Sequence, residues 1–190
     1  SLASRPIRIV LCDEVDRYPT SAGTEGDPIS LARKRSATFW NRKVIMVSTP
    51  TNKGASRIED AYSKSDQRQY HVPCKHCHHS QVLKWANVKW DDGQPETAKY
   101  LCEECGVLWT EADRVWAIRN GEWIAKEPFK GIAGFAINGL CSPWTPLSDG
   151  VRDFLSVKKN PEQLRVWTNT YLGETWEDAG ERLDDFELAD

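Results

Sequence analysis

Two adjacent carboxylates directly follow a short apolar segment near the beginning of the chain. Residues 9–12, Ile-Val-Leu-Cys, lead into Asp13 and Glu14. A buried strand of a parallel sheet delivers such residues to its carboxyl edge, where open α/β sheets bind their ligands. There one acid can hold Mg²⁺ on a triphosphate and the next can polarise the attacking water. We expect Asp13 to be the Mg²⁺-holding acid and Glu14 to be the water-activating base. Asp16 lies beyond the expected strand and is the lesser candidate.

A second apolar segment, residues 44–47, ends in the polar sequence Ser48-Thr49-Pro50-Thr51. If the two segments are neighbouring parallel strands, the hydroxyls of Ser48, Thr49 and Thr51 lie within reach of the γ-phosphate. Hydroxyls in that place can sense the phosphate and relay its loss to neighbouring elements, which is a coupling task and not a chemical one. The simpler alternatives are a surface or helix-capping pair of acids and an ordinary strand-ending turn.

The nucleotide site that these residues suggest is incomplete. The phosphate loop G-x-x-x-x-G-K-[ST], which cradles the phosphates in such sites, does not occur in the 190 residues. The pattern therefore indicates part of an ATPase. We expect no appreciable hydrolysis of ATP by these 190 residues alone.

Two Cys-x-x-Cys pairs, Cys74 with Cys77 and Cys102 with Cys105, are separated by 24 residues. Each pair can form a tight turn that aims two thiolates at one point, and two such turns complete a tetrahedral Zn²⁺ shell. In a cytosolic protein, metal binding is favoured over disulfides. A shell of four thiolates leaves no open position, so the predicted zinc is structural and not catalytic.

The identity of one ligand of this site is uncertain, because histidines lie near the cysteine pairs in the sequence. Four histidines could replace a thiolate, although surface positions are the expected ones: His71, His76, His78 and His79. Cys12 and Cys141 have no partner at metal-binding spacing, and we expect them to be buried as small apolar residues.

The composition is that of a soluble globular protein, with 39% hydrophobic and 28% charged residues. No apolar run approaches the ~18 residues of a membrane span, so we expect no membrane association and a cytoplasmic location. The net charge of −3 argues against a protein that coats DNA, yet residues 1–63 carry ten basic and seven acidic side chains. Nucleotide or nucleic acid would be expected at the basic half, and ordinary solvated surfaces are the equal alternative. We expect the tryptophans, which are numerous from Trp85 onward, to lie in the core.

The pattern of apolar residues and turn formers predicts an alternating α/β part followed by short strands and helices. The first part should contain strands at 7–12 and 44–47, covered on both faces by helices, and helices at 28–39 and 56–63. The second part should contain short strands around the cysteines, a hairpin turning at Asn120-Gly121, a strand at 132–140, and helices at 147–159 and from 161 to about 173.

The expected fold class is therefore α/β, with a partial P-loop-type parallel sheet, an inserted or appended zinc ribbon and a small α+β or helical segment. The expected divisions are 1–68 for the C-terminal part of an ATPase domain, 69–110 for the zinc ribbon, 111–173 for an α+β segment packed on the ATPase core, and 174–190 for an acidic linker.

Several motifs occur in an order that resembles a known family. They are the acidic segment 13–19, the Val-Ser-Thr-Pro-Thr segment 47–51, the two cysteine pairs, Ser-Pro-Trp at 142–144 and Asn-Thr-Tyr-Leu-Gly-Glu-Thr-Trp-Glu at 169–177. In this order, over nearly the whole chain, they are similar to the lambda-type large terminase subunit of tailed bacteriophages and prophages. The ordered combination is more specific than any one of the motifs.

The resemblance implies a DNA-packaging motor. In that family an additional-strand P-loop domain hydrolyses ATP to pump double-stranded DNA into a prohead, and an RNase H-like nuclease domain cuts the concatemer. By resemblance, Asp13 and Glu14 belong to the second nucleotide-binding motif and residues 48–51 form the coupling motif. The phosphate loop should precede residue 1 and the nuclease should follow residue 190. ATP and Mg²⁺ are the implied cofactors, and the implied partners are DNA, the small terminase subunit, the portal protein and further copies of the chain in the host cytoplasm.

Two rival interpretations remain open from the residues. A helicase or translocase of the DEAD-like group also pairs Asp-Glu-x-Asp with a Ser/Thr coupling motif. A zinc-ribbon module for nucleic-acid binding or assembly, without catalysis, is the second. A nuclease fold downstream favours the terminase, whereas a second recA-like lobe favours the helicase.

Overall fold

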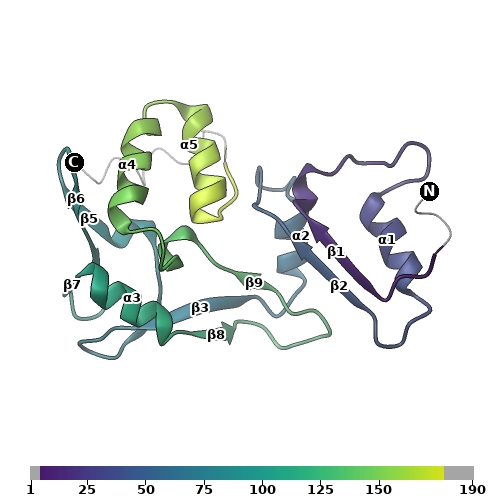
Figure 1. Cartoon of the computed structure of the whole chain (residues 1–190), viewed down its shortest axis with the longest axis horizontal. Helices are drawn as coiled ribbons and strands as arrows, with labels where there is room; N and C mark the ends of the chain where they lie inside the picture. The colour runs from purple at the N-terminus through teal and green to yellow at the C-terminus, as the bar shows by residue number, and fades with distance from the viewer. Residues whose placement is uncertain (1–4, 178–190) are drawn as a thin grey trace.

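The N-terminal part of the chain forms a two-stranded parallel sheet. The computed structural model describes residues 5–177, and in it β1 (Ile9–Asp13) pairs with β2 (Lys43–Val47). The register aligns Asp13 with Val47, so both strands end at the same edge (Figure 1). The two strands confirm the sequence prediction. The larger P-loop-type sheet stays a prediction, because no third strand joins these two among the described residues.

Two capped helices flank this sheet. α1 (Pro28–Ser36) begins with proline in its first turn, and the Asp27 carboxylate accepts a hydrogen bond from the N–H of Ser30 at 2.8 Å. α2 (Arg57–Ser63) follows β2, and Ser56 caps it by accepting from the N–H of Glu59 at 3.1 Å. Both helices agree with the sequence prediction.

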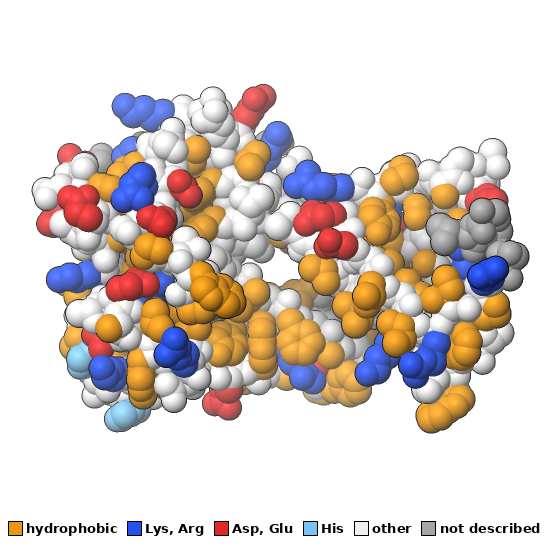
Figure 2. Space-filling model, viewed as in Figure 1, with side chains coloured by type: hydrophobic (Ala, Val, Ile, Leu, Met, Phe, Trp, Pro, Cys, Tyr) orange, Lys and Arg blue, Asp and Glu red, His pale blue; other side chains and the backbone are white. Residues whose placement is uncertain are grey.

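Only one face of the β1–β2 sheet is covered among the described residues. Val10 and Cys12 are buried together with Ile29 of α1, whereas Leu11 between them is 71% exposed. Ile45 and Val47 of β2 are exposed as well, and Figure 2 shows hydrophobic side chains gathered over this part of the molecule. The expectation that helices cover both faces is therefore wrong for residues 5–177. The alternation follows from the pleat, which turns successive side chains to opposite faces.

The cysteine-containing region consists of two small sheets. In the first, β3 is the central strand, flanked by antiparallel β4 and β8, and β9 pairs with it in parallel. The second is an antiparallel sheet in the order β5-β6-β7. The strand bounds are β3 (Arg68–Pro73), β4 (Ser80–Val82), β5 (Val88–Asp91), β6 (Gln94–Leu101), β7 (Leu108–Trp109), β8 (Glu122–Ala125) and β9 (Phe135–Ala136).

Three helices complete the described chain, and none of the described helices is long and apolar enough to cross a membrane. They are α3 (Glu111–Arg119), α4 (Leu147–Val157) and α5 (Pro161–Trp167), and a π-helical turn (Thr168–Leu172) extends α5. The helix ends at Gly173, whose φ of 65° suits the left-handed position after a helix. α4 and α5 confirm the sequence prediction.

The predicted hairpin at Asn120-Gly121 is wrong. A capping box of Thr110 and Asp113 starts α3, which continues up to Arg119. The N–H and the side-chain amide of Asn120 both donate to the carbonyl of Trp116, so Asn120 ends a helix and does not turn a hairpin.

The predicted strand at 132–140 is shorter than expected, because only β9 is extended and Gly139–Cys141 forms a 3₁₀ turn. Gly134 allows the chain to pass close to Ser65, since a Cβ there would lie 2.0 Å from the Ser65 hydroxyl oxygen.

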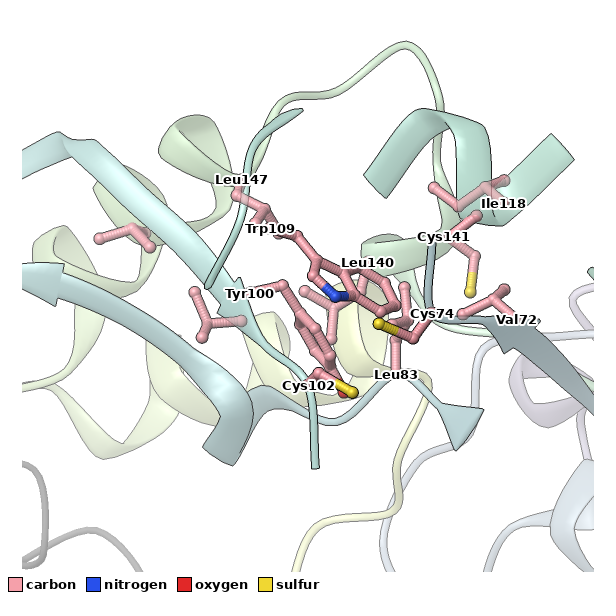
Figure 3. Packing of buried hydrophobic residues seen from close by; sticks show 13 residues of the cluster. Val72, Cys74, Leu83, Tyr100, Cys102, Trp109, Ile118, Leu140, Cys141 and Leu147 are labelled. Atoms are coloured by element: carbon pink, nitrogen blue, oxygen red, sulfur yellow. The ribbon is translucent and has the colours of Figure 1, made fainter. Parts of the chain in front are cut away.

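One hydrophobic core joins the cysteine region to the helices that follow it. Tyr100 of β6 and Trp109 of β7 pack with Leu140 and with Val151 of α4. Figure 3 shows the packing around Trp109. The core crosses the expected boundary between residues 110 and 111. The division of the chain into domains stays a prediction. Trp144, 89% exposed, shows that the expectation of a core position is wrong for some tryptophans.

A buried arginine organises the segment between β9 and α4. The Arg114 guanidinium is fully buried and pairs with Glu111 on the same helix. It also donates to three backbone carbonyls, those of Leu140, Ser142 at 3.0 Å and Thr145 at 2.9 Å. No other charged side chain among the described residues donates to these carbonyls, so Arg114 fixes the path of residues 140–145.

Replacing Arg114 by methionine should destabilise the protein strongly. The substitution keeps an unbranched apolar stem but leaves three carbonyls without their donor, and each buried unpaired group costs about 1–3 kcal/mol. We therefore expect the free energy of unfolding in urea to fall by about 3 kcal/mol or more. The matched control is Arg119→Met on the exposed end of α3, which should change it by less than about 0.5 kcal/mol. Equal effects of the two substitutions would contradict this account.

Candidate functional site

The parallel sheet brings the two predicted catalytic motifs to one edge. Asp13 lies opposite Val47, so Glu14 and Ser48 are the next residues at this edge. The Asp13 carboxylate is exposed and accepts, among the described residues, only from the N–H of Glu14 at 3.0 Å. It is therefore available to a metal ion. No described interaction joins the side chains of Asp13 and Ser48.

Glu14 has an unusual backbone conformation. Its φ of 52° and ψ of 47° place a non-glycine residue in the left-handed region, and such conformations cluster at functional sites. Its carboxylate accepts from the Nε of Arg17 at 3.1 Å, with both side chains largely exposed. An exposed ion pair of this kind is weak, about 0.2–1 kcal/mol. Glu14 is thus held at the sheet edge by its backbone more than by its partner.

Asp16 contacts the predicted coupling residues directly. Its N–H donates to the Ser48 hydroxyl at 3.2 Å, and its carboxylate accepts from the Thr51 hydroxyl at 3.0 Å. The other carboxylate oxygen accepts from the N–H of Ile58 at 2.8 Å, in the first turn of α2. One side chain therefore joins the end of β1, the segment after β2 and the start of α2. Asp16 is thus more closely connected than its place beyond the expected strand suggests, and the Asp-Glu-x-Asp spacing is the sequence signal for it.

The predicted coupling residues differ in their contacts. The Ser48 hydroxyl accepts from Asp16 and donates to the carbonyl of Thr49 at 2.8 Å, and the Thr51 hydroxyl donates to Asp16. The Thr49 hydroxyl makes no hydrogen bond within residues 5–177. We call residues 48–53 the coupling loop. Their role at a nucleotide stays a prediction.

The segment 169–177 packs against the coupling loop. The Asn169 side-chain amide donates to the carbonyl of Thr51 at 3.0 Å and to that of Glu174 at 2.8 Å. Trp176 exchanges backbone hydrogen bonds with the loop, donating to Thr51 and accepting from Lys53, each at 3.0 Å. In the sequence this segment is recognisable only as part of the family resemblance. The structure places it against the residues expected to sense the phosphate.

The four predicted metal ligands converge on one point. The Sγ atoms of Cys74, Cys77, Cys102 and Cys105 all lie within 4.8 Å of one another. Two of the separations are 3.9 Å, between Cys74 and Cys105, and 3.8 Å, between Cys77 and Cys102. A tetrahedral zinc with Zn–S bonds of about 2.3 Å places its sulfurs about 3.8 Å apart. The four thiols therefore fit a structural zinc ion.

Each cysteine pair is shaped by a turn with a left-handed residue. In the first pair the N–H of His78 donates to the carbonyl of Cys74 at 2.9 Å, and His78 has a φ of 61°. In the second, the N–H of Gly106 donates to the carbonyl of Cys102 at 3.1 Å, and Gly106 has a φ of 68°. These turns aim both sulfurs of a pair in the same direction.

The surroundings of the thiols favour the ionised form of Cys102. Burial opposes its ionisation, but the N–H groups of Cys105 and Glu104 and the Gln81 amide, 3.3 Å from the sulfur, bring its pKa to about 6. At Cys77 the N–H of His79 favours the thiolate, yet burial and the three neighbouring thiols raise the pKa to about 12. A bound Zn²⁺ would supply the charge that lets the remaining thiols ionise.

The remaining cysteines and the histidines lie outside this cluster. His79 faces Glu103 at 3.3 Å, and His76 lies 3.9 Å from Asp113. The metal-binding cluster found among the described residues contains four cysteines and no histidine. Cys12 and Cys141 are buried, as predicted.

The chain therefore combines a parallel sheet edge that carries exposed acids and hydroxyls with a cluster of four thiols that could hold a metal ion. Comparison with known proteins identifies the family. Residues 1–123 match the family model "Phage terminase large subunit gpA, ATPase domain", and residues 132–190 match "Terminase large subunit gpA, endonuclease domain". The chain belongs to the phage terminase large subunit gpA family. The endonuclease match lies inside the chain, whereas the sequence analysis placed the nuclease after residue 190. The helicase alternative is thereby set aside.

Two relatives support this family assignment. The chain is 33% identical to the large terminase subunit of Enterobacteria phage P21 over 98% of its length, and 32% identical to that of Escherichia phage lambda over 90%. It spans about a third of the length of these relatives, 33% and 31% respectively. No solved structure matches it.

Loss of one thiolate should release the metal and unfold the ribbon. We expect one zinc per chain by elemental analysis, and Cys102→Ser should lower this content and expose residues ~70–110 to hydrogen exchange. Metal binding supplies about 10–16 kcal/mol in zinc-finger peptides, so the ribbon depends on it. Cys12→Ala, which removes a thiol outside the cluster, should keep the zinc. Freshly purified protein without zinc would rule out this assignment.

Proposed function

We propose that this chain is the part of a phage DNA-packaging ATPase that activates the attacking water and transmits the result of hydrolysis. The observation that carries the proposal is the parallel pairing that brings Asp13-Glu14 and the coupling loop to one edge. Membership of the terminase family supports it. The proposed partners are double-stranded DNA, the small terminase subunit, the portal protein and further copies of the chain, in the cytoplasm of the host.

The proposed chemistry assigns one role to each residue at the sheet edge. Mg²⁺ and ATP, when bound, supply the reacting phosphoryl group and neutralise its charge. Asp13 offers an exposed carboxylate to the metal. Glu14 would accept a hydrogen bond from the attacking water and take its proton as the water oxygen bonds to the γ-phosphorus and the bond from that phosphorus to the ADP oxygen breaks. To do so its carboxylate must leave Arg17, which the weakness of that exposed pair permits.

The proposed coupling runs through Asp16. A displacement of the coupling loop changes the hydrogen bond between Thr51 and Asp16, and Asp16 also holds the first turn of α2. The carbonyl of Thr51 accepts from Asn169 and Trp176, within the part that matches the endonuclease model. The same displacement would therefore reach both sides of the loop. The zinc ion is proposed to be structural, since four thiolates leave it no open position.

Removing the base should separate nucleotide binding from hydrolysis. In the full-length protein, Glu14→Gln should keep the affinity for ATP but lower the rate of hydrolysis by about 10²–10⁴-fold, because a positioned general base contributes that much. The measurement is steady-state phosphate release together with nucleotide binding at equilibrium. Glu25→Gln, on an exposed loop, is the control. Near-normal turnover would remove Glu14 from this role.

Breaking the contact between the loop and Asp16 should uncouple the motor. Thr51→Val preserves shape but removes the hydroxyl that donates to Asp16. We expect ATP affinity and hydrolysis to change little while the length of DNA packaged per ATP falls. Thr38→Val removes an exposed hydroxyl at the end of α1 and should change neither quantity. If packaging per ATP is unchanged in Thr51→Val, residues 48–51 are only a strand-ending turn.

A further inference from the structure

A crevice of about 290 Å³ lies between the coupling loop and α5. Arg17 and Arg165, which are far apart in the sequence, both line it. Asn52, Thr51 and Asn169 contribute its polar groups. None of its lining residues is acidic. In a chain with a net charge of −3, two arginines and no acidic lining residue make the crevice locally basic, although Arg17 also pairs with Glu14 at its edge.

The Arg165 side chain has no partner among residues 5–177. It lies in the last turn of α5 and is half-buried, and no hydrogen bond or ion pair of its guanidinium is found within the described part of the chain. A guanidinium carries five N–H donors and no acceptor, so Arg165 has donors that solvent or the oxygens of a ligand can meet. Arg17 uses its Nε for Glu14 and keeps its remaining donors free.

The other polar groups of the crevice are mostly occupied. The Asn169 amide donates both of its hydrogens to the carbonyls of Thr51 and Glu174. The Thr170 hydroxyl donates to the carbonyl of Val166 at 2.7 Å. The free donors are therefore the two guanidinium groups and the side chain of Asn52. This set matches an oxyanion with several acceptor oxygens, and guanidinium groups bind phosphate through paired hydrogen bonds.

We propose that this crevice binds a phosphate group, with Arg17 and Arg165 as its charged ligands. The inference rests on the proposed function, which brings phosphate to the protein in two forms, the DNA backbone and the nucleotide. Either source presents the same oxygens to the arginines.

A phosphate in the crevice would also act on the sheet edge. Arg17 is shared between the crevice and Glu14, so a bound phosphate competes with the Glu14 carboxylate for its guanidinium. The exposed ion pair is easily exchanged. Occupation of the crevice thus releases Glu14, which the proposed function makes the water-activating base. It also fills the space beside Asn169, which joins the coupling loop to α5.

The test measures phosphate binding by the zinc-loaded 190-residue chain. A short labelled DNA duplex is titrated by fluorescence anisotropy over a range of salt concentrations, and Mg²⁺-ATP and inorganic pyrophosphate are titrated by calorimetry. Arg165→Gln and Arg17→Gln should each weaken the binding of the phosphate-bearing ligand several-fold. With DNA, each should also lower the slope of log affinity against log salt by about one. Zinc content and circular dichroism verify that the variants are folded.

Arg119→Gln is the matched control, since it removes an arginine without a described partner from the exposed end of α3. Weaker binding of DNA in the two crevice variants alone identifies the DNA backbone as the source of the phosphate. Weaker binding of pyrophosphate or ATP alone identifies the nucleotide. The proposal is overturned if the crevice variants bind every ligand like the unmodified chain, or if Arg119→Gln weakens binding equally. None of these measurements needs turnover, so they stay interpretable even if the full-length protein does not hydrolyse ATP.

Discussion

The carboxylate of Asp16 is the point at which the ends of three segments meet. The parallel register of β1 and β2 brings their carboxyl ends together. Asp16, which follows β1, binds both the segment after β2 and the first turn of α2. Hydrogen bonds to a charged acceptor are about twice as strong as neutral ones, and two of the three use this carboxylate. The position of the coupling loop therefore depends on Asp16, and the loop in turn holds residues 169–177 through the carbonyl of Thr51. The sheet edge, which is the proposed place of nucleotide chemistry, and the endonuclease-matched part thus share one hydrogen-bond network.

The rest of the chain is held by two further devices. Two backbone turns bring the four thiols of the ribbon together, and Arg114 holds the segment between β9 and α4 by its backbone carbonyls. Both adjoin the core around Tyr100, Trp109 and Leu140. This core packs the cysteine region against α4. α5 carries Arg165, and the π-helical turn after it carries Asn169, which binds the coupling loop.

Much of this arrangement could be predicted from the sequence, because some signals are local. The spacing of the cysteines predicts their convergence, and apolar runs ending in polar residues predict β1, β2 and their common edge. The failures concern information that the local pattern does not contain. Asn120-Gly121 resembles a hairpin turn, but the capping box at Thr110 commits the preceding residues to a helix. The apolar sequence of β1 cannot reveal that one face is uncovered among the described residues, and the contacts of Asp16 join residues far apart in the chain.

The central claim is that the edge formed by β1 and β2 receives the reacting end of a nucleotide. A structure of the full-length protein with Mg²⁺ and a non-hydrolysable ATP analogue tests it most directly. The account predicts that Mg²⁺ is coordinated by Asp13, at about 2.1 Å or through one water. It also predicts that the γ-phosphate faces Glu14 and the hydroxyls of the coupling loop. A nucleotide bound with its Mg²⁺ away from Asp13, and with Glu14 and residues 48–51 remote from the γ-phosphate, would contradict the claim.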